Sequence, residues 1–176
     1  MRSINSALPL QQLGSGQLLC VVPSFQVGLI LQQPHYAEFV GVGAIVGGSF
    51  DIKCKSIYAI GTVDFSVPTT YRERQRGFQL RINYMKQQQA ITSVSSPLKR
   101  ACLMVQQLCS WIGATEARQI PADLVAQLVG VLPGTVDTAW QCYQRGDRVT
   151  ANLAVCCPLA DPQPLSSHAK SRTALM

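Results

Sequence analysis

Cysteine and histidine are the residue types in this 176-residue chain best suited to metal or nucleophilic chemistry. The two histidines are His35 and His168, and no Cys-x-x-Cys pair occurs. The cysteines, which follow no repeated spacing, are Cys20, Cys54, Cys102, Cys109, Cys142, Cys156 and Cys157. Zinc and iron–sulfur sites need clustered soft ligands, so this pattern predicts buried or free thiols. The alternative is a partial ligand set of Cys156, Cys157 and His168. No Ser–His–Asp or Cys–His arrangement can be assembled, and we expect no enzyme activity, no metal and no cofactor.

The run Gly41–Gly48, Gly-Val-Gly-Ala-Ile-Val-Gly-Gly, is a candidate for phosphate binding. A phosphate-binding loop also needs a Lys-Ser/Thr pair and a following helix. Neither is present here, so the run predicts a glycine-rich turn between strands.

The net charge of +6 permits an acidic partner such as nucleic acid, and its distribution along the chain is uneven. Residues 71–100 contain one acidic side chain, Glu73, and the basic residues Arg72, Arg74, Arg76, Arg81, Lys86, Lys99 and Arg100. This cluster is either a solvated helix face or linker, or a surface that lies beside DNA. Residues 119–150 carry no comparable excess of positive charge.

The first seventy residues are β-rich, with short apolar stretches separated by Gly and Pro breakers. The stretches are Gln17–Val22, Val27–Gln32, Phe39–Val46 and Ser56–Val67. Their spacing predicts a small barrel or sandwich. The apolar run within them, Leu18–Leu31, is too short to span a membrane and is interrupted by Pro23. We therefore expect no membrane partner and a reducing, cytoplasmic compartment.

Two helices are expected after the β-rich part. Tyr71–Gln89 fits both the strand and the helix period, and its Arg- and Gln-rich flanks favour a helix. After a polar break, apolar residues recur at three- and four-residue steps along Leu98–Ile112, with Pro97 suited to the first turn. Gly113 should end this helix in the left-handed conformation.

A helix-turn-helix unit is predicted for residues 122–145. Two helices that meet through a very short turn need a small residue at their crossing, and Ala126 supplies it. Gly130 can take the positive φ of the turn, Val131 can fill the space between the helices, and Val136 can point inward from the second helix. The alternative is a plain helical hairpin inside an all-α core.

The stretch from about Leu98 to Arg145 resembles the C-terminal domain of the cyclic-AMP receptor protein family of bacterial transcription regulators. In that family a jelly-roll effector domain and a long dimerisation helix lie upstream. The resemblance implies an α+β protein with a truncated, jelly-roll-like N-terminal domain and a C-terminal winged-helix domain. The expected divisions are a β-rich domain (1–70), a connecting and candidate dimerisation segment (71–96), the helix-turn-helix domain (97–157) and a flexible tail (158–176). Residues 149–157 would form one arm of the wing.

The resemblance also implies double-stranded DNA as partner, bound by a homodimer through the major groove. The family usually has a Ser or Thr cap followed by Arg and Glu, where this chain has Leu132, Pro133 and Gly134. No stretch suited to gripping a cyclic nucleotide is found, so none is expected to bind. The predicted DNA contacts are Thr135, Thr138 and Gln141 to bases, and Arg118, Arg145 and Arg148 to phosphates. The alternative is a protein-interaction module that kept this scaffold and lost its base readers.

Overall fold

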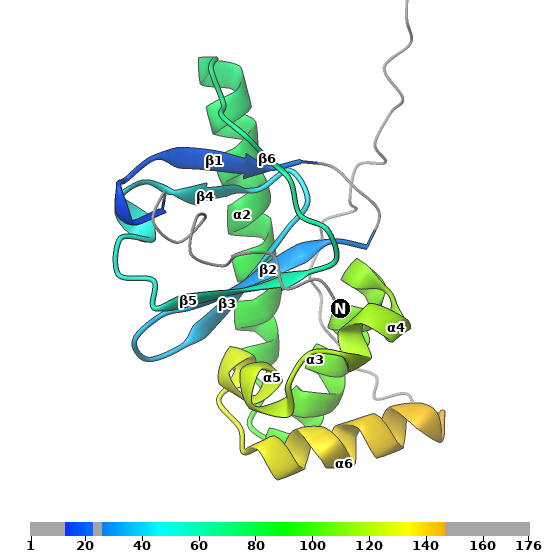
Figure 1. Ribbon diagram of the computed structural model, residues 1–176. Coiled ribbons are helices and arrows are strands. Elements are labelled where there is room, and N and C mark those ends of the chain that lie inside the picture. The colour runs from blue at the N-terminus through cyan, green and yellow to red at the C-terminus, as the bar shows by residue number, and fades with distance from the viewer. Residues whose placement is uncertain (1–12, 23–25, 147–176) are drawn as a thin grey trace, which may run out of the picture.

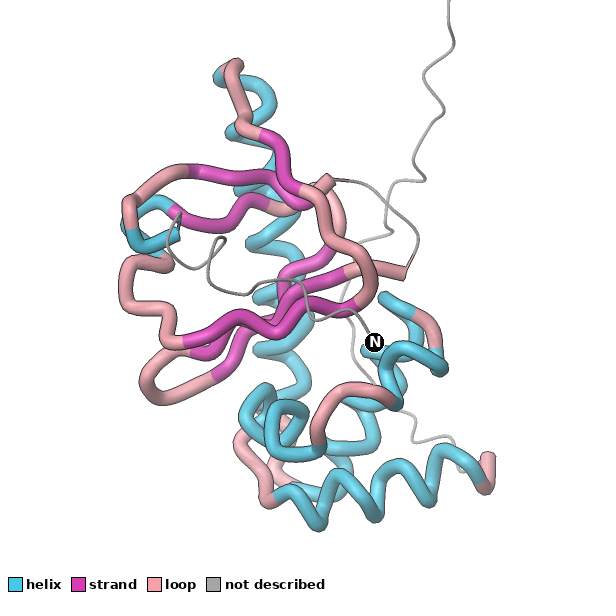
Figure 2. The backbone as a smooth tube through the Cα atoms, in the orientation of Figure 1, coloured by secondary structure: helices cyan, strands magenta, loops and turns pink. Residues whose placement is uncertain are grey.

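The computed structural model describes residues 13–22 and 26–146, which form an α+β structure (Figures 1 and 2). Its strands are β1 (Leu18–Val21), β2 (Gly28–Gln32), β3 (Ala37–Gly41), β4 (Ile45–Gly47), β5 (Ser56–Ile60) and β6 (Phe65–Ser66). A 3-10 helix, η1 (Gly48–Phe50), follows β4. The helices are α2 (Tyr71–Thr92), α3 (Pro97–Ile112), α4 (Ala114–Arg118), α5 (Ala122–Val129) and α6 (Pro133–Gln144).

The strands form two small antiparallel sheets, ordered β4-β1-β6 and β3-β2-β5. Two of the predicted strands are wrong as single elements, because each divides between the two sheets. Phe39–Val46 contributes to β3 and β4, and a turn at Gly43, with φ +76°, separates them. Ser56–Val67 contributes to β5 and β6, with Gly61 at φ +69° between them. A non-glycine residue rarely adopts such a φ, so these glycines set the strand ends. The prediction that the Gly41–Gly48 run turns the chain between strands is confirmed.

The helical interpretation of the segment after the strands is confirmed by α2, which runs through to Thr92. A capping box fixes its start: the Thr70 side chain accepts from the Glu73 N–H, and the Glu73 carboxylate accepts from the Thr70 N–H. The helix α3 also begins as predicted, with Pro97 in its first turn. Its end differs from the prediction, since Gly113 has φ +84° but an extended ψ of 154°. That backbone leads directly into the short helix α4, where only a connection was expected.

Apolar packing joins the β-rich part to the helices. A cluster of buried side chains runs from the β3-β2-β5 sheet through α2 to α3, α5 and α6, and includes Ile30, Phe39, Met104, Leu128 and Val136. A second cluster lies largely between the two sheets. The helix α2 runs behind both sheets, and α3–α6 gather at its C-terminal end (Figure 1). Within the described residues, no helix combines the length and apolarity that crossing a membrane requires.

Candidate nucleic-acid interface

The helices α5 and α6 are joined by three residues, and the backbone of the turn is as predicted. Gly130 has φ 64° and ψ 52°, the left-handed conformation that ends α5. A Cβ added to Gly130 would meet nothing within 4 Å, so glycine is needed here for its backbone angle and not for space. The Val131 N–H then donates to the Ala126 carbonyl oxygen at 3.1 Å, which closes the turn.

The inner faces of the two helices are packed at the predicted positions. Ala126 is 3% exposed, and Val136 is fully buried. Val131 is half-buried against the core, as expected of the residue between the helices. Ala139 of α6 is buried in a small cluster with residues of α3. The helix α6 is therefore held from behind by α3 and from one end by α5, which leaves its opposite face to solvent.

The outer face of α6 is polar but almost uncharged. Gly134, Asp137, Thr138, Gln141 and Gln144 are exposed. The Thr138 hydroxyl donates to the Gly134 carbonyl oxygen at 3.0 Å. This face can offer amide and hydroxyl groups to a partner, with Asp137 as its one charged side chain before the helix ends.

The beginning of α6 carries no side-chain cap. Leu132 occupies the N-cap position without a side-chain hydrogen bond, and Pro133 follows in the first turn, as expected. The Leu132 side chain is 76% exposed, the highest value among the large apolar residues described.

The predicted DNA-contacting residues lie along or beside α6. Thr135 is half-buried, and Thr138, Gln141 and Arg145 are exposed. Arg118, at the end of α4, places its guanidinium carbon 5.7 Å from the centre of the Trp140 ring. Arg148 lies outside the described residues, as do the proposed wing at 149–157 and the tail at 158–176.

A pocket of about 500 Å³ brings two of these residues together. It lies between α6 and the turn that precedes α5, and Arg118 and Gln141 both line it, with Asp137, Trp140 and Gln144. The two threonines do not line this pocket. A surface that places a cation and amides side by side can hold an anionic group, although Asp137 reduces that attraction.

The segment from α4 to α6 carries little net charge of its own, and Arg100 of α3 reaches its turn, where Nη2 donates to the Gly130 carbonyl oxygen at 3.1 Å. Residues 114–146 contain two basic side chains, Arg118 and Arg145, and three acidic ones, Glu116, Asp123 and Asp137. The basic cluster of residues 71–100 does not add to this surface as a unit. Its first three arginines are in the exposed opening turns of α2, at the end of that helix remote from α6 (Figure 1). The helix has 22 residues, which at about 1.5 Å per residue gives a length of about 33 Å.

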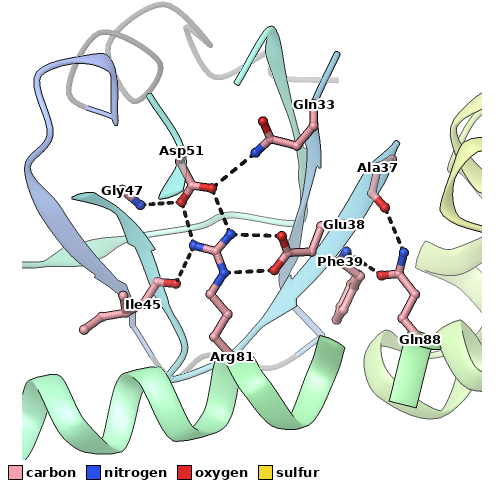
Figure 3. A network of polar contacts seen from close by, with 9 residues as sticks. All are labelled: Gln33, Ala37, Glu38, Phe39, Ile45, Gly47, Asp51, Arg81 and Gln88. Atoms are coloured by element: carbon pink, nitrogen blue, oxygen red, sulfur yellow. Dashed lines mark hydrogen bonds and ion pairs between the residues drawn. The ribbon is translucent and has the colours of Figure 1, made fainter. Parts of the chain in front are cut away.

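Arg81 differs most from what its place in the basic cluster indicated, because its side chain is neither solvated nor available to DNA. Its guanidinium is buried between two carboxylates (Figure 3). Its Nε and Nη2 donate to the Glu38 carboxylate at 2.8 and 2.9 Å, and its Nη1 and Nη2 donate to the Asp51 carboxylate at 2.6 and 2.8 Å. Burial opposes the charge, but the hydrogen bonds to Asp51 and Glu38 outweigh it and raise the pKa of Arg81 above its ordinary value.

Gln88 is a second buried polar residue that the sequence did not reveal. The strand β3 is at the edge of its sheet, so some of its backbone groups lack a neighbouring strand. The Gln88 amide replaces that neighbour: its oxygen accepts from the Phe39 N–H at 3.2 Å, and its nitrogen donates to the Ala37 carbonyl at 2.8 Å (Figure 3). The same nitrogen donates to the Leu128 carbonyl of α5 at 2.9 Å. Gln88 therefore connects the β-rich part directly to α5.

One signal in the sequence could have pointed to the Arg81 network. Glu38 is the only acidic residue in the first fifty positions and lies in an otherwise apolar strand. A carboxylate in such a strand must be paired if it is buried. Its partners come from distant segments, so their identity could not be read from local spacing.

The cysteines that are described lie apart from any metal-binding arrangement. Among the described residues, no group of three or more His, Cys, Asp or Glu side chains could hold a metal ion. Burial is the main cause that raises the pKa of the Cys20, Cys54 and Cys109 thiols, which makes these thiols poor nucleophiles at neutral pH. The proposed partial ligand set of Cys156, Cys157 and His168 lies outside the described residues.

No protein-family model matches this sequence, and comparison with curated proteins gives no significant match.

Proposed function

We propose that this protein is a DNA-binding transcription regulator that places α6 in the major groove, with an organisation similar to that of the cyclic-AMP receptor protein family. The observation that carries the proposal is the α5–α6 unit. Its left-handed Gly130, buried Val136 and short turn fix two helices with the outer face of the second one exposed. In this interpretation the two sheets are a truncated jelly roll, and no cyclic nucleotide is bound.

Phosphate contacts would supply most of the affinity. Arg118 and Arg145 flank the exposed face of α6, where they could contact the backbone on either side of the groove. Gln141 and the two threonines Thr135 and Thr138 would contact bases. With so few basic residues beside α6, we expect modest affinity that depends strongly on salt concentration.

A homodimer would double this small interface. The exposed side of α2 carries large apolar residues at steps of seven, four and three residues: Tyr71, Phe78, Ile82 and Met85. Tyr71, Ile82 and Met85 are 73%, 42% and 46% exposed, and Phe78 contacts Phe50 of η1 edge to face. Pairing of two α2 helices would cover this stripe.

Sedimentation velocity tests the dimer. Ile82→Glu should shift the protein to monomer, whereas Ile82→Leu should stay dimeric. A wild-type protein that is monomeric at all concentrations would contradict the proposed dimer.

The DNA proposal is tested by fluorescence anisotropy of the full chain with a random-sequence duplex over a salt series. The double variant Arg118→Ala/Arg145→Ala removes two charges beside α6, and Arg72→Ala/Arg74→Ala removes two charges at the remote end of α2. Each lost phosphate contact should reduce the slope of log affinity against log salt by about 1. We expect a reduction by about 2 for the first variant and little change for the second. Equal losses in both variants, or no binding by folded wild type at low salt, would contradict the proposal.

The near-neutral charge of residues 114–146 favours a second candidate function, a protein-interaction module on the same scaffold. The exposed Leu132 at the start of α6 is the type of residue that anchors a protein contact. The salt series separates the two functions, because a protein-interaction module would give no salt-dependent DNA binding.

A further inference from the structure

The N-terminal end of α6 presents an apolar tip to solvent. Leu132 is 76% exposed, and Pro133 and Gly134 beside it are exposed too. Packing of the unit itself does not require a leucine there, because Val131 before it and Val136 after it fill the space between the helices. In a helix-turn-helix complex this end of the second helix lies closest to the base edges.

Within α6 itself no side chain suits the reading of guanine, and Arg100 of α3, which reaches the preceding turn, donates to the Val94 and Gly130 carbonyl oxygens at 3.1 Å. Guanine presents two acceptors, O6 and N7, in the major groove, and Arg or Lys usually donates to both. Neither residue type occurs between Leu132 and Gln144. Asp137 can only accept hydrogen bonds when ionised, and the Thr138 hydroxyl already donates to the Gly134 carbonyl oxygen.

One group in the major groove does suit an exposed leucine. Thymine carries a 5-methyl group, which apolar side chains contact, and cytosine, adenine and guanine offer nothing comparable. We propose that Leu132 contacts a thymine methyl group, so that the protein prefers duplexes rich in T·A pairs. Gln141, exposed on the same side of α6 as Thr138, can make the paired hydrogen bonds that adenine N6 and N7 require. This inference rests on the proposed DNA binding and specifies which class of base that site selects.

The test uses two duplexes of alternating adenine and thymine that differ only in that the second contains deoxyuridine in place of thymidine. Both have the same phosphate charge and the same hydrogen-bonding groups, so a difference in affinity reports the methyl groups. The full chain should bind the thymine duplex about fourfold more tightly for each methyl group that Leu132 covers, the factor expected for burying one methylene-sized group. Leu132→Ala should reduce the ratio of the two affinities to about one. The control Ile52→Ala, which truncates a 54% exposed residue in the loop after η1, should leave the ratio unchanged.

Three results would overturn the inference. Salt-dependent binding of equal strength to both duplexes would refute the methyl contact and leave the proposed DNA binding standing. A preference for thymine that persists in Leu132→Ala would show that another residue reads the methyl group. No binding of either duplex at low salt would refute both the inference and the proposed function.

Discussion

Replacing Arg81 by methionine tests the buried charge network most directly. Methionine is close to arginine in length and fills much of the same space, so the main change is the loss of the guanidinium. The Arg81 side chain is 7% exposed, and those of Glu38 and Asp51 are 5% and 0% exposed. The substitution would leave two carboxylates facing each other without a cation. Asp51 would keep the Gly47 N–H at 2.6 Å and the Gln33 amide at 3.3 Å, whereas the hydrogen bonds at 2.8 and 2.9 Å to the Glu38 carboxylate both come from Arg81 and would both be lost.

The size of the effect follows from this geometry. Breaking a buried ion pair by removing one partner costs about 3–5 kcal/mol, because the other charge stays buried. Here one cation serves two anions through four hydrogen bonds of 2.6–2.9 Å, so we expect the upper part of that range. Arg81→Lys keeps the charge but cannot form the planar, bidentate contact with both carboxylates. We expect it to lose about half as much stability.

The assay is urea unfolding at pH 7, followed by circular dichroism and by the fluorescence of Trp111 and Trp140. The loss of unfolding free energy should be largest for Arg81→Met and about half as large for Arg81→Lys, which keeps the charge between the two carboxylates. Arg74→Met, an exposed arginine on the same helix, is the matched control and should change stability by less than about 0.5 kcal/mol.

Two results would refute this reasoning. A loss below about 1 kcal/mol at pH 7 would mean that the carboxylates are solvated or paired elsewhere. A larger loss that is the same for Arg81→Met and Arg81→Lys would mean that the fit of the guanidinium, and not its charge, is what stabilises the fold.

Three further predictions concern the α5–α6 unit and its attachment to the sheet. Gly130→Ala should destabilise the protein by about 1–2 kcal/mol, because the φ of 64° at this position is unfavourable for any side chain. Gly134→Ala within α6 should instead stabilise the protein by about 0.5–1 kcal/mol. Thermal unfolding checks both variants, and a change in stability of the same sign in both would contradict this prediction. Gln88→Leu should lower the free energy of unfolding by about 3 kcal/mol, because it leaves three buried backbone groups without their partner. The control Gln89→Leu changes an exposed residue and should be nearly neutral. Comparable urea midpoints for the two variants would argue against the connection between sheet and helices. Pro133→Arg places a side chain that can read guanine at the start of α6. By fluorescence anisotropy, this variant should bind a guanine-containing duplex about tenfold more tightly than an alternating adenine–thymine duplex. An unchanged preference would show that this end of α6 does not reach the bases.

The two helices α5 and α6 and their turn were predictable because the demands of this unit are local. Ala126, Gly130, Val131 and Val136 lie within eleven positions, and each is constrained by backbone angle or by the crossing of adjacent helices. The periodicity of α3 was equally clear, since buried residues recur at helical spacing over four turns. The strand ends were less predictable: an apolar stretch such as Phe39–Val46 has the composition of one strand, and the turn within it depends on a single glycine.

The sequence by itself determined the helical periodicity of α3, the turn between α5 and α6, and the absence of basic residues along α6. Each of these depends on neighbours in the chain or on composition. The tertiary structure decided the role of Arg81, which composition placed in a basic surface cluster and which the fold buries against Glu38 and Asp51, 43 and 30 positions away. It also decided that Gln88 joins an edge strand to α5. Buried polar groups must find hydrogen-bond partners wherever the chain brings them, so their identity emerges only when distant segments are packed together.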